Sequence, residues 1–177
     1  MSDPYIITRS GQKYFFEFPS LEAITIGDIA HALSNICRYT GHCSEFYSVA
    51  EHSVLVSRMV PQEHALAGLM HDSPEAYVND LSHPLKKLVP DHRGIEAIAW
   101  GVISRKFGLP LELHECVHQA DADAYKMESR ALMPPMGEGD GRPEAVDRGG
   151  DPYCWPPVVA RLEFLRRYHE LTGGKHG

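Results

Sequence analysis

Three features are missing from this 177-residue sequence, and each absence excludes a class of protein. No apolar run reaches the ~18 residues that a helix needs to cross a bilayer, so we expect no membrane-spanning segment and no membrane partner. The first residues, Met1-Ser2-Asp3-Pro4, lack the charged and apolar regions of a signal peptide. The four cysteines show no C-x-x-C spacing, which argues against a zinc knuckle and a disulfide framework. We therefore expect a reduced, cytoplasmic protein.

Blocks of basic residues are also missing. The formal net charge is −7, so binding to a nucleic-acid backbone is not favoured. A local basic pocket for a small phosphate stays compatible with this charge. Hydrophobic residues make up 43% of the chain, which suffices for the core of one domain over residues 1–177.

Hydrophobic periodicity predicts an all-α fold with a small N-terminal β-hairpin at about residues 5–18. The helical core should cover about 25–133, with a first helix at about 26–38. A Pro- and Gly-rich loop is predicted at 134–157, and a last helix at about 158–171, ended by Gly173-Gly174. Within the core, Ser48 and Glu51 have the S-x-x-E spacing of a capping box. Helices are also expected at about 62–71, 93–107 and 111–133, with a turn at 80–87.

His71-Asp72 is the most informative pair of residues. It lies where an apolar stretch ends against Ser73-Pro74, and Pro74 cannot continue a helix interior. We expect Ser73 to cap a new short helix that begins at Pro74. A buried imidazole and a buried carboxylate at such a break need a partner, and a divalent cation would supply it.

Two further metal-binding residues lie on predicted apolar helix faces. His52 shares a stripe with Val49 and Val56, and Asp121 shares one with Val117 and Ala124. The same periodicity turns Asp123 away from the core, so Asp121 is the predicted buried carboxylate. Two imidazoles and two carboxylates suit Mn²⁺, Fe²⁺, Co²⁺ or Zn²⁺. Each of these residues by itself is more often structural than a metal ligand, and the spacing alone leaves both interpretations open.

The ordered motifs resemble the HD-domain metal-dependent phosphohydrolases. The similarity rests on Ala50-Glu51-His52-Ser53, Met70-His71-Asp72-Ser73-Pro74-Glu75, Asp80-Leu81, Pro84-Leu85-Lys86 and Gln119-Ala120-Asp121-Ala122. It covers roughly residues 25–133 and is strongest for the small bacterial and phage branch with 5′-deoxynucleotidases and deoxynucleoside triphosphate triphosphohydrolases. This resemblance implies a single HD domain, a helical bundle around one divalent metal ion.

The resemblance also implies roles for individual residues. His52, His71, Asp72 and Asp121 match the four metal-ligand positions. Glu75 matches the acidic residue that handles the attacking water, although acidic residues also favour the first turn of any helix. The implied contacts to the substrate are Arg38 with phosphate or sugar, Asp80 with sugar, and Lys86 with phosphate. For Lys86, a solvated position on a surface turn is the alternative.

The expected function is metal-dependent hydrolysis of a nucleotide phosphate ester, with a 5′-monophosphate as the first choice of substrate. The alternative is release of intact triphosphate from a deoxynucleoside triphosphate. A di-iron HD oxygenase needs additional ligands that the sequence does not offer, and a non-catalytic metal-binding regulatory domain would need neither Glu75 nor Lys86. We expect a small nucleotide substrate, no nucleic-acid partner and a homo-oligomer.

Overall fold

The computed structural model describes residues 3–135 and 152–173, which form helices and one small antiparallel hairpin. Strands β1 (Tyr5–Ile7) and β2 (Lys13–Phe15) pair with Tyr5 opposite Phe15. The turn between them is fixed to the first helix, because Asp28 accepts hydrogen bonds from the backbone N–H and the hydroxyl of Ser10 at 2.9 and 2.6 Å. The predicted hairpin is therefore confirmed, and it is anchored to the helical part of the chain.

The helices follow in an order that matches the predicted pattern. Their bounds are α1 (Ile26–Asn35), α2 (Val49–Met59), α3 (Ala65–Met70), α4 (Glu75–Val78), α5 (His83–Lys86), α6 (Pro90–Phe107), α7 (Glu115–Leu132) and α8 (Pro157–Thr172). Gly108 and Gly173 end α6 and α8 in the left-handed conformation that glycine adopts without strain. No helix in the described ranges has the length and apolarity that a membrane crossing would require.

Four of these helices pack around one core. In this core α1 packs on α8 and α2, and α3 packs on α2 and α8. The contact between α2 and α3 is close, because a Cβ on Gly68 would meet the Ser57 Cα at 3.2 Å. Leu33, Leu69 and Phe164 are fully buried where these helices meet. Removal of such side chains from water is the main stabilising contribution to the fold.

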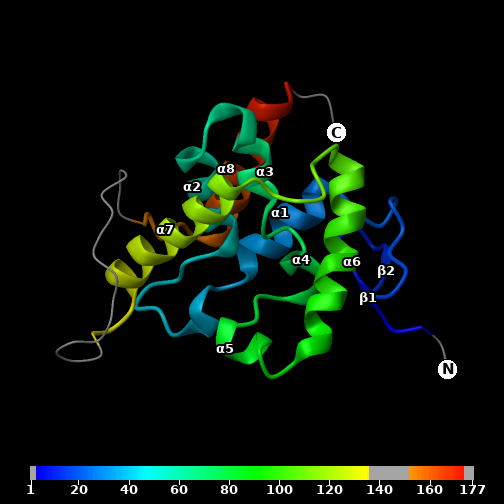
Figure 1. Ribbon diagram of the computed structural model, residues 1–177, viewed down its shortest axis with the longest axis horizontal. Coiled ribbons are helices and arrows are strands. Elements are labelled where there is room, and N and C mark those ends of the chain that lie inside the picture. Colours follow the sequence, from blue (N-terminus) through cyan, green and yellow to red (C-terminus); the bar gives the residue numbers. More distant parts are fainter. Residues whose placement is uncertain (1–2, 136–151, 174–177) are drawn as a thin grey trace.

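Helices α6 and α7 flank these four helices on opposite sides in Figure 1, and α6 adds Ala99, Ile103 and Phe107 to the core. Helix α7 packs on α2, whereas α6 contacts α4 and α5. The chain between α3 and α4, which carries His71 and Asp72, therefore lies between the two outer helices. This arrangement positions the predicted metal ligands.

The structure corrects several local predictions. The first helix ends at Asn35, so Arg38 lies in the segment after it. Ser73 does not cap α4, because its hydroxyl donates to the Met70 carbonyl at 2.6 Å and Pro74 takes the cap position. A short helix, α5, replaces the turn predicted at 80–87. The helix predicted from residue 111 begins at Glu115, after the N-cap His114.

Two further predictions have a partial outcome. Only half of the predicted capping box forms: the Ser48 hydroxyl accepts from the Glu51 N–H at 3.1 Å, but the Glu51 carboxylate faces elsewhere. It accepts three backbone N–H groups, from residues 153–155, because these donors lie outside regular structure and need an acceptor. Most of the predicted 134–157 loop lies outside the described residues.

Candidate metal centre

The four predicted metal ligands lie near one another between α2, α3 and α7: donor atoms of His52, His71 and Asp72 all lie within 4.8 Å of one another, and Asp121 approaches the two imidazoles. His52 extends from the N-terminal end of α2, and its Nε2 lies 3.3 Å from the His71 Nε2. Asp72 Oδ2 lies 3.4 Å from the His52 Nε2 and 3.2 Å from the His71 Nε2. On α7, Asp121 Oδ1 lies 3.1 and 3.9 Å from the same two nitrogens. Residues far apart in the sequence thus present two nitrogens and two carboxylates to the same small volume.

The outer nitrogens of both imidazoles fix which nitrogen carries the proton. His71 Nδ1 lies 2.8 Å from the Gly68 carbonyl oxygen, which can only accept, so Nδ1 must be the donor. His52 Nδ1 lies 2.6 Å from Glu128 Oε1, and an ionised carboxylate also only accepts. Each neutral imidazole therefore directs the lone pair of its Nε2 toward the other. Metal-bound histidines are oriented by this kind of hydrogen bond, so the donor set fits a divalent cation.

The charges at this point favour a cation. Burial alone would lower the pKa of His71, but Asp72 and Asp121 raise it well above its usual value. Burial alone would raise the pKa of Asp72, but His71 lowers it well below the usual range. The carboxylates therefore favour positive charge at this point, and a divalent metal ion would supply that charge without protonation of the imidazoles.

Glu128 is the hydrogen-bond partner of the His52 Nδ1, and the sequence did not predict it. Its carboxylate is fully buried on α7 and accepts from the Tyr47 hydroxyl at 2.9 Å and from the Arg38 Nε at 3.0 Å, besides His52. It follows Asp121 by two helical turns, so it occupies the same face of α7. The spacing of seven residues from Asp121 is the one signal that could have identified Glu128, but an acidic residue on a helix is usually solvated.

The relative burial of the two aspartates on α7 differs from the prediction. Asp123 is buried, with its side chain 3% exposed, whereas the Asp121 side chain is 44% exposed. Gln119 and Lys126 both donate to Asp123 Oδ1 at 3.0 Å. The prediction that Asp121 is the buried carboxylate and that Asp123 is turned away from the core is therefore wrong, although Asp121 Oδ1 does lie 3.1 Å from the His52 Nε2. The exposure of Asp121 leaves an approach to the centre.

Arg38 lies beside the centre with its guanidinium directed inward. Its NH1 is 3.7 Å from Asp72 Oδ2, and its Nε donates to Glu128. The following residues, Tyr39 and Thr40, both have a φ of 55°, a conformation that costs about 1–3 kcal/mol for residues other than glycine. The Tyr39 hydroxyl lies 3.3 Å from the Tyr125 carbonyl, which holds this turn against α7. The structure therefore shows Arg38 bound to the ligand framework.

Glu75 and Lys86 form a second group beside the ligands. Lys86 Nζ lies 2.7 Å from Glu96 Oε1 and 3.7 Å from Glu75 Oε1, so Lys86 is paired and is not a freely solvated surface lysine. Glu75 is buried, and its Oε2 has no hydrogen-bond partner among the described residues. Burial raises the pKa of Glu75 well above its usual value, and the negative charges of Asp72 and Asp80 raise it further. Asp80 itself is partly buried, and burial raises its pKa as well.

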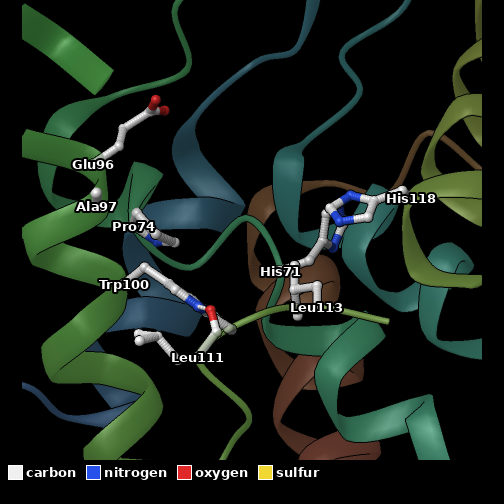
Figure 2. Close-up of a pocket in the computed structure, with 8 residues that line it drawn as sticks. All are labelled: His71, Pro74, Glu96, Ala97, Trp100, Leu111, Leu113 and His118. Atoms are coloured by element: carbon white, nitrogen blue, oxygen red, sulfur yellow. Dashed lines mark hydrogen bonds between the residues drawn. The ribbon is translucent and has the colours of Figure 1, made fainter. Parts of the chain in front are cut away.

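A cavity of about 320 Å³ opens beside this group. Figure 2 shows Glu96 and Trp100, from α6, on one side and His71, Leu113 and His118 on the other. The Trp100 indole donates to the Leu111 carbonyl at 2.8 Å, which fixes the ring at the cavity wall. Because His71 also lines the cavity, a molecule bound there would adjoin the predicted metal ligands.

Comparison with known proteins identifies relatives for this chain. A protein of Escherichia coli K12, named "Uncharacterized protein YfdR", is 46% identical over 128 residues, which is 72% of each chain. The chain belongs to the family of YfdR. A protein of Rhodobacter capsulatus, "Uncharacterized protein RCAP_rcc00048", is 29% identical over 187 residues and 95% of each chain. No family model matches the sequence.

Proposed function

We propose that this chain is an HD-domain hydrolase that uses one divalent metal ion to cleave the phosphate ester of a (deoxy)nucleoside 5′-monophosphate. One observation carries the proposal: two imidazole Nε2 atoms and two carboxylates converge beside a buried carboxylate, Glu75, one oxygen of which has no partner in the described part of the chain. A purely structural metal site has no use for that oxygen, because a buried polar atom without a partner costs about 1–3 kcal/mol.

His52, His71, Asp72 and Asp121 would hold the cation. When bound, a divalent cation would lower the pKa of a coordinated water and polarise a phosphoryl oxygen. Four protein ligands suit Mn²⁺, Co²⁺ or Fe²⁺, which leave further positions open, and Zn²⁺ where its coordination exceeds four.

Glu75 would transfer the proton. Hydrolysis adds the oxygen of water to phosphorus and breaks the bond between phosphorus and the 5′ oxygen, which must then receive a proton. A buried carboxyl group with a raised pKa both accepts a proton from water and returns it to the leaving oxygen near neutral pH. Lys86, 3.7 Å from Glu75 Oε1, supplies positive charge at the same place.

The cavity beside His71 would take the nucleoside. Its volume of about 320 Å³ lies at the lower end of the range for small-molecule sites, about 300–1,000 Å³. Trp100 and Leu111 offer apolar surface to a base, while Glu96 and His118 offer polar groups. Arg38, which bonds to Glu128 and lies 3.7 Å from Asp72, would stabilise the ligand carboxylates and balance negative charge near the phosphate.

Product analysis on a nucleotide panel tests this proposal. The purified protein is incubated with a deoxynucleoside 5′-monophosphate or 5′-triphosphate in the presence of Mn²⁺, Co²⁺, Mg²⁺ or Zn²⁺. Inorganic phosphate released from the monophosphate is the expected result. Intact triphosphate from the triphosphate substrate alone would instead support a triphosphohydrolase, and no hydrolysis with any metal would refute the proposal.

The aspartates of α7 provide a matched pair for the metal assignment. Asp121→Asn should reduce bound metal and activity together, because Asp121 Oδ1 faces both imidazoles. Asp123→Asn changes the same charge on the same helix but should retain the metal. Equal metal content in the two variants, measured by elemental analysis, would contradict the assigned ligand set.

A further inference from the structure

A second cluster of metal-binding side chains lies outside the candidate metal centre. His64 ends the 3-10 turn at Gln62–His64 before α3, His114 is the N-cap of α7, and Cys116 lies in the first turn of that helix. One potential ligand atom from each residue lies within 4.8 Å of the others. None of the three matches a motif, and the cysteine spacing predicts no zinc site.

The donor atoms of this cluster are available. No described residue forms a side-chain hydrogen bond with His64, whose ring stacks on the His114 ring with centroids 4.3 Å apart and planes at 17°. His114 Nδ1 accepts from the Cys116 N–H at 3.2 Å, so its lone pair points toward the turn that carries the thiol. Cys116 is not in a disulfide. It is partly buried and packs against the small apolar cluster of Val56, Ala67 and Val117.

The geometry needs only a small adjustment to hold a cation. Zinc binds imidazole nitrogen and thiolate sulfur at about 2.0–2.3 Å, so ligand atoms in a tetrahedral shell are about 3.3–3.8 Å apart. The ligand atoms lie within 4.8 Å of one another, so side-chain rotations that shift them by at most about 1 Å would bring them to this spacing. Bound metal would replace the long hydrogen bond at His114 Nδ1, and the N-terminus of α7 favours the negative charge of a thiolate.

We propose that His64, His114 and Cys116 form a second metal site that binds Zn²⁺ or a similar thiophilic divalent cation. Three protein ligands leave the fourth tetrahedral position to water. Bound metal would link the turn before α3 to the start of α7, beside a small apolar cluster shared by α2, α3 and α7 through Val56, Ala67 and Val117. Since α3 leads to His71 and α7 carries Asp121, this link would stabilise both elements. The proposal does not depend on the hydrolase activity.

Cobalt titration of the purified full-length protein separates this site from the candidate metal centre. A thiolate bound to Co²⁺ gives a near-ultraviolet charge-transfer band, and the four ligands of the other centre include no sulfur. Because the candidate metal centre also takes Co²⁺, we expect up to two equivalents to be needed to produce this band in the unmodified protein, and Zn²⁺ to abolish it by displacement. The band should be lost in Cys116→Ser and weakened at least tenfold in apparent affinity in His64→Ala.

Two control variants show whether the band comes from this cluster. Cys43→Ser removes another partly buried thiol, and His169→Ala removes an exposed imidazole on α8, so both should retain the band. Excess Zn²⁺ at about 100 times its Kd should also raise the Tm of the unmodified protein by about 5–10 °C more than that of Cys116→Ser. If Cys116→Ser does not fold, His64→Ala provides the test by itself. A band that is absent from the unmodified protein, that persists in Cys116→Ser, or that keeps its full Co²⁺ affinity in His64→Ala would overturn the proposal.

Discussion

Replacement of Glu128 by glutamine tests how the protein prepares the imidazole of His52 for metal binding. Glu128 Oε1 accepts from His52 Nδ1 at 2.6 Å and from Tyr47, while Oε2 accepts from Arg38. Glutamine has the same shape but only one acceptor oxygen. Its NH₂ group must therefore face either Arg38, where two donors would oppose each other, or His52, where Nδ1 would have to become the acceptor.

The second arrangement moves the imidazole proton of His52 to Nε2, which removes the lone pair that faces the metal. Loss of such an outer hydrogen-bond partner weakens metal binding by about 10–100-fold, or about 1.4–2.7 kcal/mol. Loss of one charge of a buried pair costs about 3–5 kcal/mol, and we expect the lower end because Asp72 stays 3.7 Å from Arg38. At about 2–4 °C per kcal/mol for a chain of this length, Tm should fall by about 6–12 °C.

Isothermal titration with Mn²⁺ measures the affinity of Glu128→Gln, and thermal melts without metal measure its stability. Glu51→Gln is the matched control: Glu51 is also a buried carboxylate, but within residues 3–135 and 152–173 its oxygens accept only the backbone N–H groups of residues 153–155. This variant should lose stability and retain Mn²⁺ affinity. Unchanged affinity in Glu128→Gln, or an equal loss in both variants, would refute the argument about the His52 proton.

Three further predictions concern catalysis and packing. Glu75→Ala should keep its bound metal while turnover falls about 10²–10⁴-fold, and a rate near the unmodified value would return Glu75 to a purely structural role. Lys86 lowers the pKa of Glu75, and a general base acts only when it is ionised. Lys86→Met should therefore move the acidic limb of the pH–rate profile to higher pH. The same variant should also weaken substrate binding, and more so for substrates with more phosphates. An unmoved limb would contradict this coupling. Leu33 is buried in the core between α1 and its neighbours, so Leu33→Ala should lower the free energy of unfolding, measured with denaturant, by about 2–5 kcal/mol. Leu162 is 55% exposed on α8, so Leu162→Ala should change it by less than about 0.5 kcal/mol.

The secondary structure of this chain follows largely from local rules. Ser48 at the start of α2, the break at Pro74, and the glycines after α6 and α8 each act through the conformation of one or two residues, so a single sequence suffices to place them. Helical periodicity also placed His52 and Asp121 on faces that meet. Helix ends were less predictable, because capping by His114 and the end of α1 before Arg38 depend on neighbouring segments.

For the candidate metal centre, too, some features were predictable from the sequence and others depended on the tertiary structure. The local pattern left a structural role open for each of its four predicted ligands, and the resemblance to the HD-domain phosphohydrolases selected them. Only the tertiary structure showed which groups surround them. Glu128 behind His52, the open side of Asp121, and the cluster of His64 with His114 depend on how α2, α3 and α7 pack. Periodicity specifies the direction of a side chain around its own helix, whereas the neighbour that it meets is decided by the relative position of helices distant in the chain.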